Sequence, residues 1–180
     1  MAFSLQAQAQ VKYEKESRLN AKLVPTTALA FIEALPIEKK IRWYLEEGLD
    51  RTSIEAKFKM NGQKYSIEFD SAGTLEDVEI QVEWETLNRV LKDSFNNQLD
   101  QDCKAFHIRK TQIQYTGNQA DLLSKLTVPE AHQNQVTRYE IIIKCRSENS
   151  VDLFEYLFSA TGQKLKADQI VFKNSSHLEY

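Results

Sequence analysis

The sequence predicts an α+β fold of two tandem units, each a short helix packed on a four-stranded antiparallel sheet. Alternating apolar and polar residues define about four strands in each half of the chain, and each half opens with one amphipathic helical pattern. Two stretches also superimpose in sequence, namely Thr52 to Met60 over Thr137 to Cys145, and Tyr65 to Gly73 over Phe154 to Gly162. We interpret this likeness as an internal duplication.

The first unit is expected at residues 22–85, after an N-terminal tail of residues 1–21. Apolar residues recur at helical spacing between Pro25 and Pro36, which predicts a short helix. Alternation then predicts strands at residues 41–46, 54–60, 65–70 and 78–85. Asn61-Gly62 is a strong hairpin signal, and Gly73 marks the following turn.

The second unit is expected at residues 86–174, before a C-terminal tail of residues 175–180. A helical pattern at 87–99 precedes a strand at 104–115, whose alternation breaks near Arg109 and predicts a bulge or a bend. A polar insertion at 117–135 contains a short helical pattern at 121–126. Strands are predicted at 137–145, 152–158 and 165–172; residues 153–158 are apolar on both faces, which favours contact with the other unit or with a homodimer mate.

Composition limits the classes of partner. The 23 basic and 26 acidic residues give a net charge of −3, so no basic surface for nucleic acid is predicted. No run of apolar residues is long enough to predict a transmembrane segment. Ala7-Gln8-Ala9 matches a signal-peptidase site behind a very short apolar run, so the tail is either the remnant of a signal peptide, with the protein periplasmic or secreted, or a plain polar tail.

The two cysteines, Cys103 and Cys145, leave two alternatives open. In an oxidising compartment they could form a disulfide, and closing a loop of about 40 residues would stabilise the fold by about 3 to 4 kcal/mol. Otherwise they are two buried free thiols. With only three histidines, no zinc-binding cluster is predicted.

Six carboxylates and no basic residue lie between Phe69 and Asn88. Glu79, Glu83 and Glu85 alternate with apolar residues, so they are predicted to share one strand face, either solvated or used with Tyr44 to bind a protein. Calcium is not expected, because residues 70–77 contain only three acids. The chain shows no nucleophile elbow and no paired carboxylates in a cleft, so we predict no catalytic residues, no metal and no cofactor.

The segments LVPTTALAFIEALPIEKKIRWYLEEG and SIEAKFKMNGQKYSIEFDSAG resemble the PepSY-like proteins, a family of exported bacterial proteins whose tandem units look like beta-lactamase-inhibitor protein. The shared features are the prolines around the helix, Trp43, Asn61-Gly62 and the turn at Gly73. The resemblance implies a non-enzymatic, inhibitor-like module that engages a protein or peptide through its sheet faces. A small periplasmic hydrolase with a site between the units, or a structural oligomerisation domain, are the alternatives.

Overall fold

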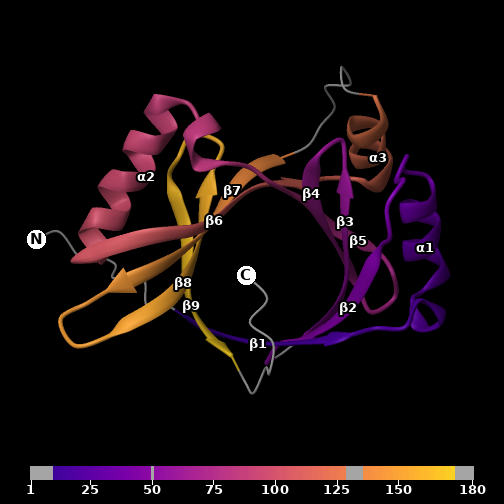
Figure 1. Cartoon of the computed structure of the whole chain (residues 1–180), viewed down its shortest axis with the longest axis horizontal. Coiled ribbons are helices and arrows are strands. Elements are labelled where there is room, and N and C mark those ends of the chain that lie inside the picture. The colour runs from indigo at the N-terminus through magenta and orange to yellow at the C-terminus, as the bar shows by residue number, and fades with distance from the viewer. Residues whose placement is uncertain (1–9, 50, 129–135, 173–180) are drawn as a thin grey trace, which may run out of the picture.

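The strands form one closed barrel, with the helices on its outside (Figure 1). The computed structural model describes residues 10–49, 51–128 and 136–172. The strands follow one another around the barrel in chain order: β1 (Gln10–Arg18), β2 (Arg42–Glu47), β3 (Thr52–Met60), β4 (Gln63–Asp70), β5 (Leu75–Gln81), β6 (Ala105–Thr116), β7 (Val136–Arg146), β8 (Val151–Ser159) and β9 (Lys164–Phe172). The helices are α1 (Thr26–Glu33), α2 (Arg89–Asp102) and α3 (Gln119–Thr127), and the short 3-10 turns η1 (Ala21–Leu23) and η2 (Trp84–Thr86) lead into α1 and α2.

The predicted fold class of two separate helix-plus-sheet units is therefore wrong, as is the description of the chain as a tandem α+β repeat. β5 joins the strands of the first half to those of the second by pairing with β6, where Val78 lies opposite Tyr115 and Gln81 opposite Gln112. β1 falls in the segment that was predicted to be a tail. It pairs antiparallel with β2 and parallel with β9, and so closes the barrel. Closure removes the free edges that two open sheets would have left.

Many of the predicted elements occur near their expected positions. The bulge in β6 is confirmed by a register shift between Ile108 and Lys110. The fourth strand of the first half was predicted to run to Glu85, but β5 ends at Gln81, and Trp84 lies in η2. That shortening changes the position of two predicted binding residues, Glu83 and Glu85.

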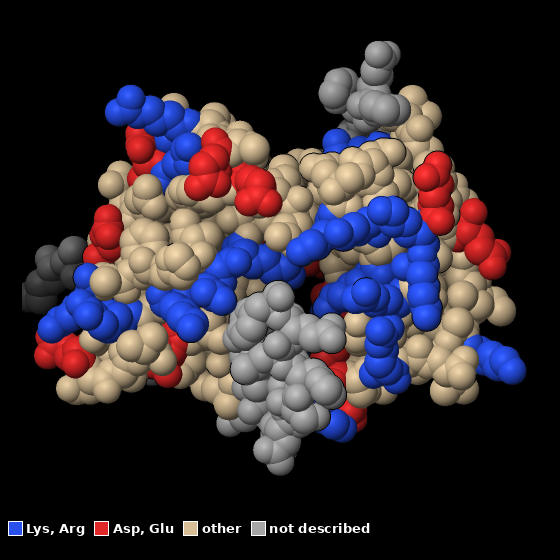
Figure 2. Space-filling model, viewed as in Figure 1, with Lys and Arg blue, Asp and Glu red and all other residues tan. Residues whose placement is uncertain are grey.

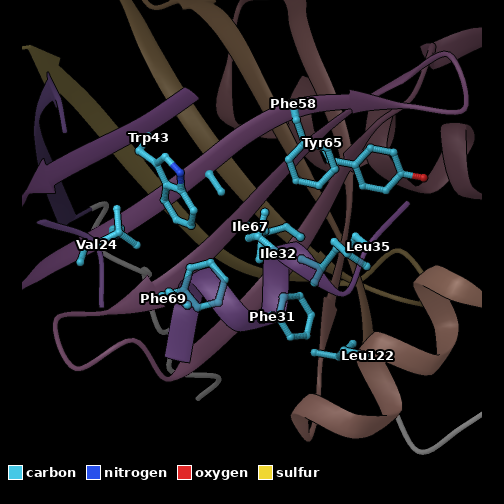
Figure 3. Close-up of a cluster of buried hydrophobic side chains, with 14 of the residues drawn as sticks. Val24, Phe31, Ile32, Leu35, Trp43, Phe58, Tyr65, Ile67, Phe69 and Leu122 are labelled. Carbon is cyan, nitrogen blue, oxygen red and sulfur yellow. The ribbon is translucent and has the colours of Figure 1, made fainter. Parts of the chain in front are cut away.

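The apolar core lies between the outer face of the barrel and the helices. On one side, Phe31 and Ile32 of α1 and Leu122 of α3 cover Ile67 and Phe69 of β4, and Figure 3 shows these side chains converging. The rings of Phe31 and Phe69 meet edge to face at 5.9 Å between centroids. An amphipathic helix and the apolar face of a sheet bury one another in this way.

The second part of the core lies under α2. Phe95 and Leu99 pack against Ile143 and Phe158, and the rings of Phe95 and Phe158 are 4.6 Å apart. The alternation in β8 places Phe154, Tyr156 and Phe158 in this core, whereas Leu153 and Leu157 face the barrel interior. The two apolar faces of residues 153–158 are therefore explained within one chain, and they no longer indicate a homodimer.

Cys103 and Cys145 are joined by a disulfide, which settles the alternative left open by the sequence. Their Cα atoms are 5.5 Å apart, within the usual range for a disulfide. The bond connects the residue that caps the C-terminus of α2 to β7. It therefore fixes one end of α2 to the barrel wall that the helix covers.

Two glycine turns fix the other contacts between helices and barrel. Gly73, with φ of 84°, and Gly162, with φ of 85°, each follow a register shift in the preceding strand pair. Thr27 of α1 donates a hydrogen bond to the carbonyl oxygen of Ala72, and Ser94 of α2 donates one to that of Gly162. The sequence likeness between the two halves thus corresponds to the same local structure: a turn with a glycine at positive φ, in which a backbone carbonyl accepts a hydrogen bond from a side chain of the covering helix.

Replacing Gly73 tests this contact. Gly73→Ala should lower the free energy of unfolding by about 3 kcal/mol, since a left-handed conformation costs an alanine about 1 to 2 kcal/mol and the added Cβ would collide with Thr27 and Pro25. The matched control is Gly62→Ala, at a φ of 80° with open space around it, which should cost only about 1 kcal/mol. Urea unfolding measures both, and equal losses would contradict the role of this turn in seating α1.

Candidate functional site: the charged interior of the barrel

The polar faces of the strands meet inside the barrel. In β3, Ile54, Ala56 and Phe58 point outward into the core, so Ser53, Glu55 and Lys57 point inward. The charge of Lys12 in β1 lowers the pKa values of both Glu68 in β4 and Glu140 in β7, as expected if these side chains face a common interior. The acidic residues on this face are Glu16, Glu46, Glu55, Glu68, Asp77, Glu79, Glu140, Glu155 and Asp168.

Figure 2 looks towards the barrel opening and shows Lys and Arg side chains around it, with Asp and Glu visible among them. Small barrels are usually filled by apolar side chains. Here the apolar side chains of the strands are mostly on the outer face, under the helices. The large number of carboxylates inside the barrel is therefore the feature that packing alone does not account for.

The structure separates the residues that were predicted to bind a partner together. Glu79 and Tyr44 both lie on the interior face, and Glu79 is only 6% exposed. Glu83 and Glu85 lie beyond the end of β5 and are exposed to solvent. They line an open cleft of about 470 Å³ together with His107 and Arg109. The predicted single acidic strand face is therefore wrong.

One group of interior carboxylates is neutralised by a lysine of the chain. The Nζ of Lys57 lies 2.7 Å from a carboxylate oxygen of Glu16 and 2.8 Å from one of Glu55. It also lies 5.0 Å from the centroid of the Tyr44 ring, and the Ser66 hydroxyl donates to the other oxygen of Glu55. Two carboxylates and an aromatic ring are a common arrangement for holding an ammonium group. We call these four residues with Lys57 the Lys57 cluster: Glu16, Tyr44, Glu55, Lys57 and Ser66.

Titration of the Lys57 cluster follows from these contacts. Burial disfavours the charged form of Glu55, but the Lys57 charge and the hydrogen bonds from Lys57 and Ser66 outweigh it and lower the pKa of Glu55. At Glu46, beside Glu55, burial and then the charges of Glu55 and Glu68 outweigh the charge of Lys57 and raise the pKa to about 10. Glu46 is therefore protonated at neutral pH.

The same place contains a candidate metal-ligand group. Carboxylate oxygens of Glu16, Glu46 and Glu55 all lie within 4.8 Å of one another. The ammonium of Lys57 already contacts two of these carboxylates, however, so it supplies the positive charge that a metal ion would bring. The residues fit an organic ammonium group better than a bound metal.

A second group lies on three neighbouring strands, and no lysine enters it. On β5 and β6, the Gln112 amide donates to Glu79 at 2.7 Å, and the Gln114 amide donates to Asp77 at 3.2 Å. Glu140 of β7 lies opposite Gln112 in the sheet register. We call these five residues the acceptor cluster: Asp77, Glu79, Gln112, Gln114 and Glu140.

The acceptor cluster has more acceptors than donors. Asp77 Oδ1, Gln112 Oε1 and Gln114 Oε1 are buried with no hydrogen-bond partner among the described residues. Glu140, the third carboxyl group of the cluster, is only 8% exposed. In the described part of the chain, five buried side-chain atoms lack a hydrogen bond, and all five are oxygens. Besides the three in the acceptor cluster, they are Asp168 Oδ1 and Glu55 Oε2, and Glu55 Oε2 contacts the ammonium of Lys57. Buried polar groups are rarely left in this state.

The carboxyl groups of the acceptor cluster respond by retaining protons. Burial, followed by the charges of Glu79, Glu68 and Glu76, raises the pKa of Asp77 to about 9. Burial and the charges of Glu79 and Glu155 raise the pKa of Glu140 well above its usual value, and Lys110 and Lys12 offset only part of this. In the ligand-free protein, protons therefore supply some of the missing positive charge.

Comparison with protein-family models, with curated proteins and with solved structures gives no match for this chain. The likeness to PepSY-like proteins stays a prediction from sequence. Among the described residues, no helix has the length and apolar character needed to cross a membrane.

Removing the lysine of the Lys57 cluster should expose the cost of burying Glu55. Lys57→Met is expected to lower the free energy of unfolding by about 2 kcal/mol at pH 8, because it leaves a buried carboxylate without its charged hydrogen-bond donor. Lys57 lowers the pKa of Glu55 in the folded state, so its stabilising effect is fully present above the unfolded-state pKa of about 4.3 and is lost as the pH falls from there through the lower folded-state pKa. Chemical denaturation at pH 8 and at a series of acidic pH values below the unfolded-state pKa measures the difference.

The control is Lys59→Met, two residues along the same face of β3, where the side chain is exposed. It should change the free energy of unfolding by less than about 0.5 kcal/mol. A Lys57→Met variant as stable as Lys59→Met at pH 8 would show that the Lys57 cluster contributes nothing to stability.

Proposed function

We propose that the protein is a non-enzymatic binding protein that holds a small organic cation inside its barrel. The observation that carries this proposal is the surplus of buried oxygen acceptors in the interior. A ligand that satisfies them must bring several N–H donors and positive charge. Amines have both properties at neutral pH.

The Lys57 cluster supports the proposal from within the same molecule. There, interior carboxylates are satisfied by a primary ammonium at 2.7 and 2.8 Å. The acceptor cluster has comparable groups on β5, β6 and β7 but no ammonium of its own. A cationic ligand would complete the second cluster as Lys57 completes the first.

An apolar interior would be the more stable design. Replacing buried charged groups by apolar ones of similar size is often neutral or stabilising. The chain nevertheless carries carboxylates on the interior side of most strands. Buried charged residues that lower stability in this way are most often found at functional sites. This favours a ligand over a purely structural role for the interior.

The enclosed sheet also changes which partner is favoured. The inhibitor-like hypothesis needs an open sheet face on which a protein or peptide can lie, but one face of this sheet carries α1, α2 and α3 and the other encloses the interior (Figure 1). A small ligand suits such an interior better than a folded partner does. Export to the periplasm or beyond is part of the proposal, and the disulfide supports it because disulfides persist in oxidising compartments.

Calorimetric titration with spermidine tests the proposal. We expect saturable binding to the intact protein, and no binding of a neutral diol of similar length. Asp77→Asn combined with Glu140→Gln should weaken spermidine binding at least about tenfold, which corresponds to about 1.4 kcal/mol.

The matched control is Glu83→Gln combined with Glu85→Gln, which removes the same number of carboxylates from the outer surface. It should leave the dissociation constant within about twofold, a difference of about 0.4 kcal/mol. Absence of spermidine binding to the intact protein, or equal loss in both double variants, would overturn the proposal.

A further inference from the structure

We propose that the acceptor cluster is a binding site for a single primary ammonium group. This inference rests on the proposed function and names the part of the interior that recognises one end of the ligand. Three features of the cluster support it: the fixed orientation of its two glutamines, the predominance of acids around it, and the lack of a lysine or arginine among its five residues.

The two glutamines are anchored so that their oxygens are free. Each amide nitrogen donates to a carboxylate, Gln112 to Glu79 and Gln114 to Asp77, which leaves each amide oxygen as the unused end. Gln112 is only 2% exposed, so solvent does not supply the missing donor freely. An ammonium group has three N–H donors, enough to engage several of these oxygens at once.

The positions on the sheet bring these groups within reach of one ligand atom. Glu79 lies opposite Gln114, and Gln112 lies opposite Glu140. Side chains at opposite positions have Cβ atoms about 5 Å apart, and diagonal neighbours are about 7 to 8 Å apart. One ammonium group can therefore contact two or three of them, with the remaining carboxylates supplying long-range attraction.

The surrounding charges favour a cation. The groups that act on Glu140 are the acids Glu79 and Glu155 and the bases Lys110 and Lys12. Those that act on Asp77 are the acids Glu79, Glu68 and Glu76 and the base Arg51, which lies within ion-pair distance of both Glu68 and Glu76. Acids outnumber bases at the cluster itself. The unpartnered oxygens of Asp77, Gln112 and Gln114 therefore lie in a part of the interior where acids predominate.

The chemistry also distinguishes primary from quaternary ammonium ions. The free groups of the acceptor cluster are hydrogen-bond acceptors, whereas quaternary ions have no N–H donor and are recognised by aromatic rings. None of the five residues of the acceptor cluster is aromatic, whereas Tyr44 lies beside Lys57. Propylammonium should therefore compete with spermidine, and tetramethylammonium should not.

A tethered ammonium provides the sharpest test. Leu157 lies opposite Glu140 on the neighbouring strand and faces the interior, so Leu157→Lys would place an ammonium beside the cluster, as Lys57 does elsewhere. We expect spermidine affinity to fall at least tenfold. We also expect a higher melting temperature than for Leu157→Gln, which is polar but uncharged and should retain binding within about threefold of the intact protein, a difference of about 0.7 kcal/mol.

The outcomes separate the two proposals. If the intact protein does not bind spermidine, the proposed function fails, and this site fails with it. If it binds spermidine and both Leu157→Lys and Glu140→Leu bind equally well, the cation lies elsewhere in the interior and only this site is wrong. Glu140→Leu removes the charge without adding one, so it decides the question if Leu157→Lys does not fold. Competition by tetramethylammonium as strong as that by propylammonium would also overturn the assignment.

Discussion

The pairing of β5 with β6, together with the closure between β1 and β9, determines the rest of the structure. Each half of the chain has strands that are apolar on one face, and the helices cover that face. Once the strands join into a ring with the helices outside, the polar faces have only the interior left. Closure thus explains where the charged side chains lie, and burial there is the main source of the raised pKa values of Glu46, Glu68, Asp77 and Glu140.

Burial then divides the interior carboxylates into two kinds. Some meet a cation of the chain, as Glu55 meets Lys57 and Glu155 meets Lys12. For others, such as Asp77 and Glu140, nearby basic residues offset only part of the cost of burial, and their raised pKa values follow from desolvation and then from the charges of neighbouring acids, first Glu79. The unequal supply of cations, rather than the number of acids, marks one part of the barrel as the binding site.

Sequence patterns predicted individual strands better than their assembly. The alternation in β3, β4 and β8, the bulge in β6 and the turns at Gly73 and Gly162 are local features, and local residue patterns encode them. Closure of the barrel depends on contacts between strands far apart in sequence, for which alternation gives no information. A strand with one polar face reads the same whether that face meets solvent or an interior. For this reason the sequence could not show that Glu79 faces an interior. Separately, alternation continues past Gln81, so the predicted strand extends to Glu85 and places Glu79 on one face with Glu83 and Glu85.

The central claim is that a cation replaces protons held by the interior carboxyl groups. Calorimetry of spermidine binding at pH 7.5, in two buffers with different ionisation enthalpies, counts the protons exchanged on binding. Because Asp77 and Glu140 have raised pKa values in the ligand-free protein, a bound cation should lower them and release protons. The account predicts a net release of about one proton or more at this pH. Binding with no proton release, or with proton uptake by the protein, would contradict it.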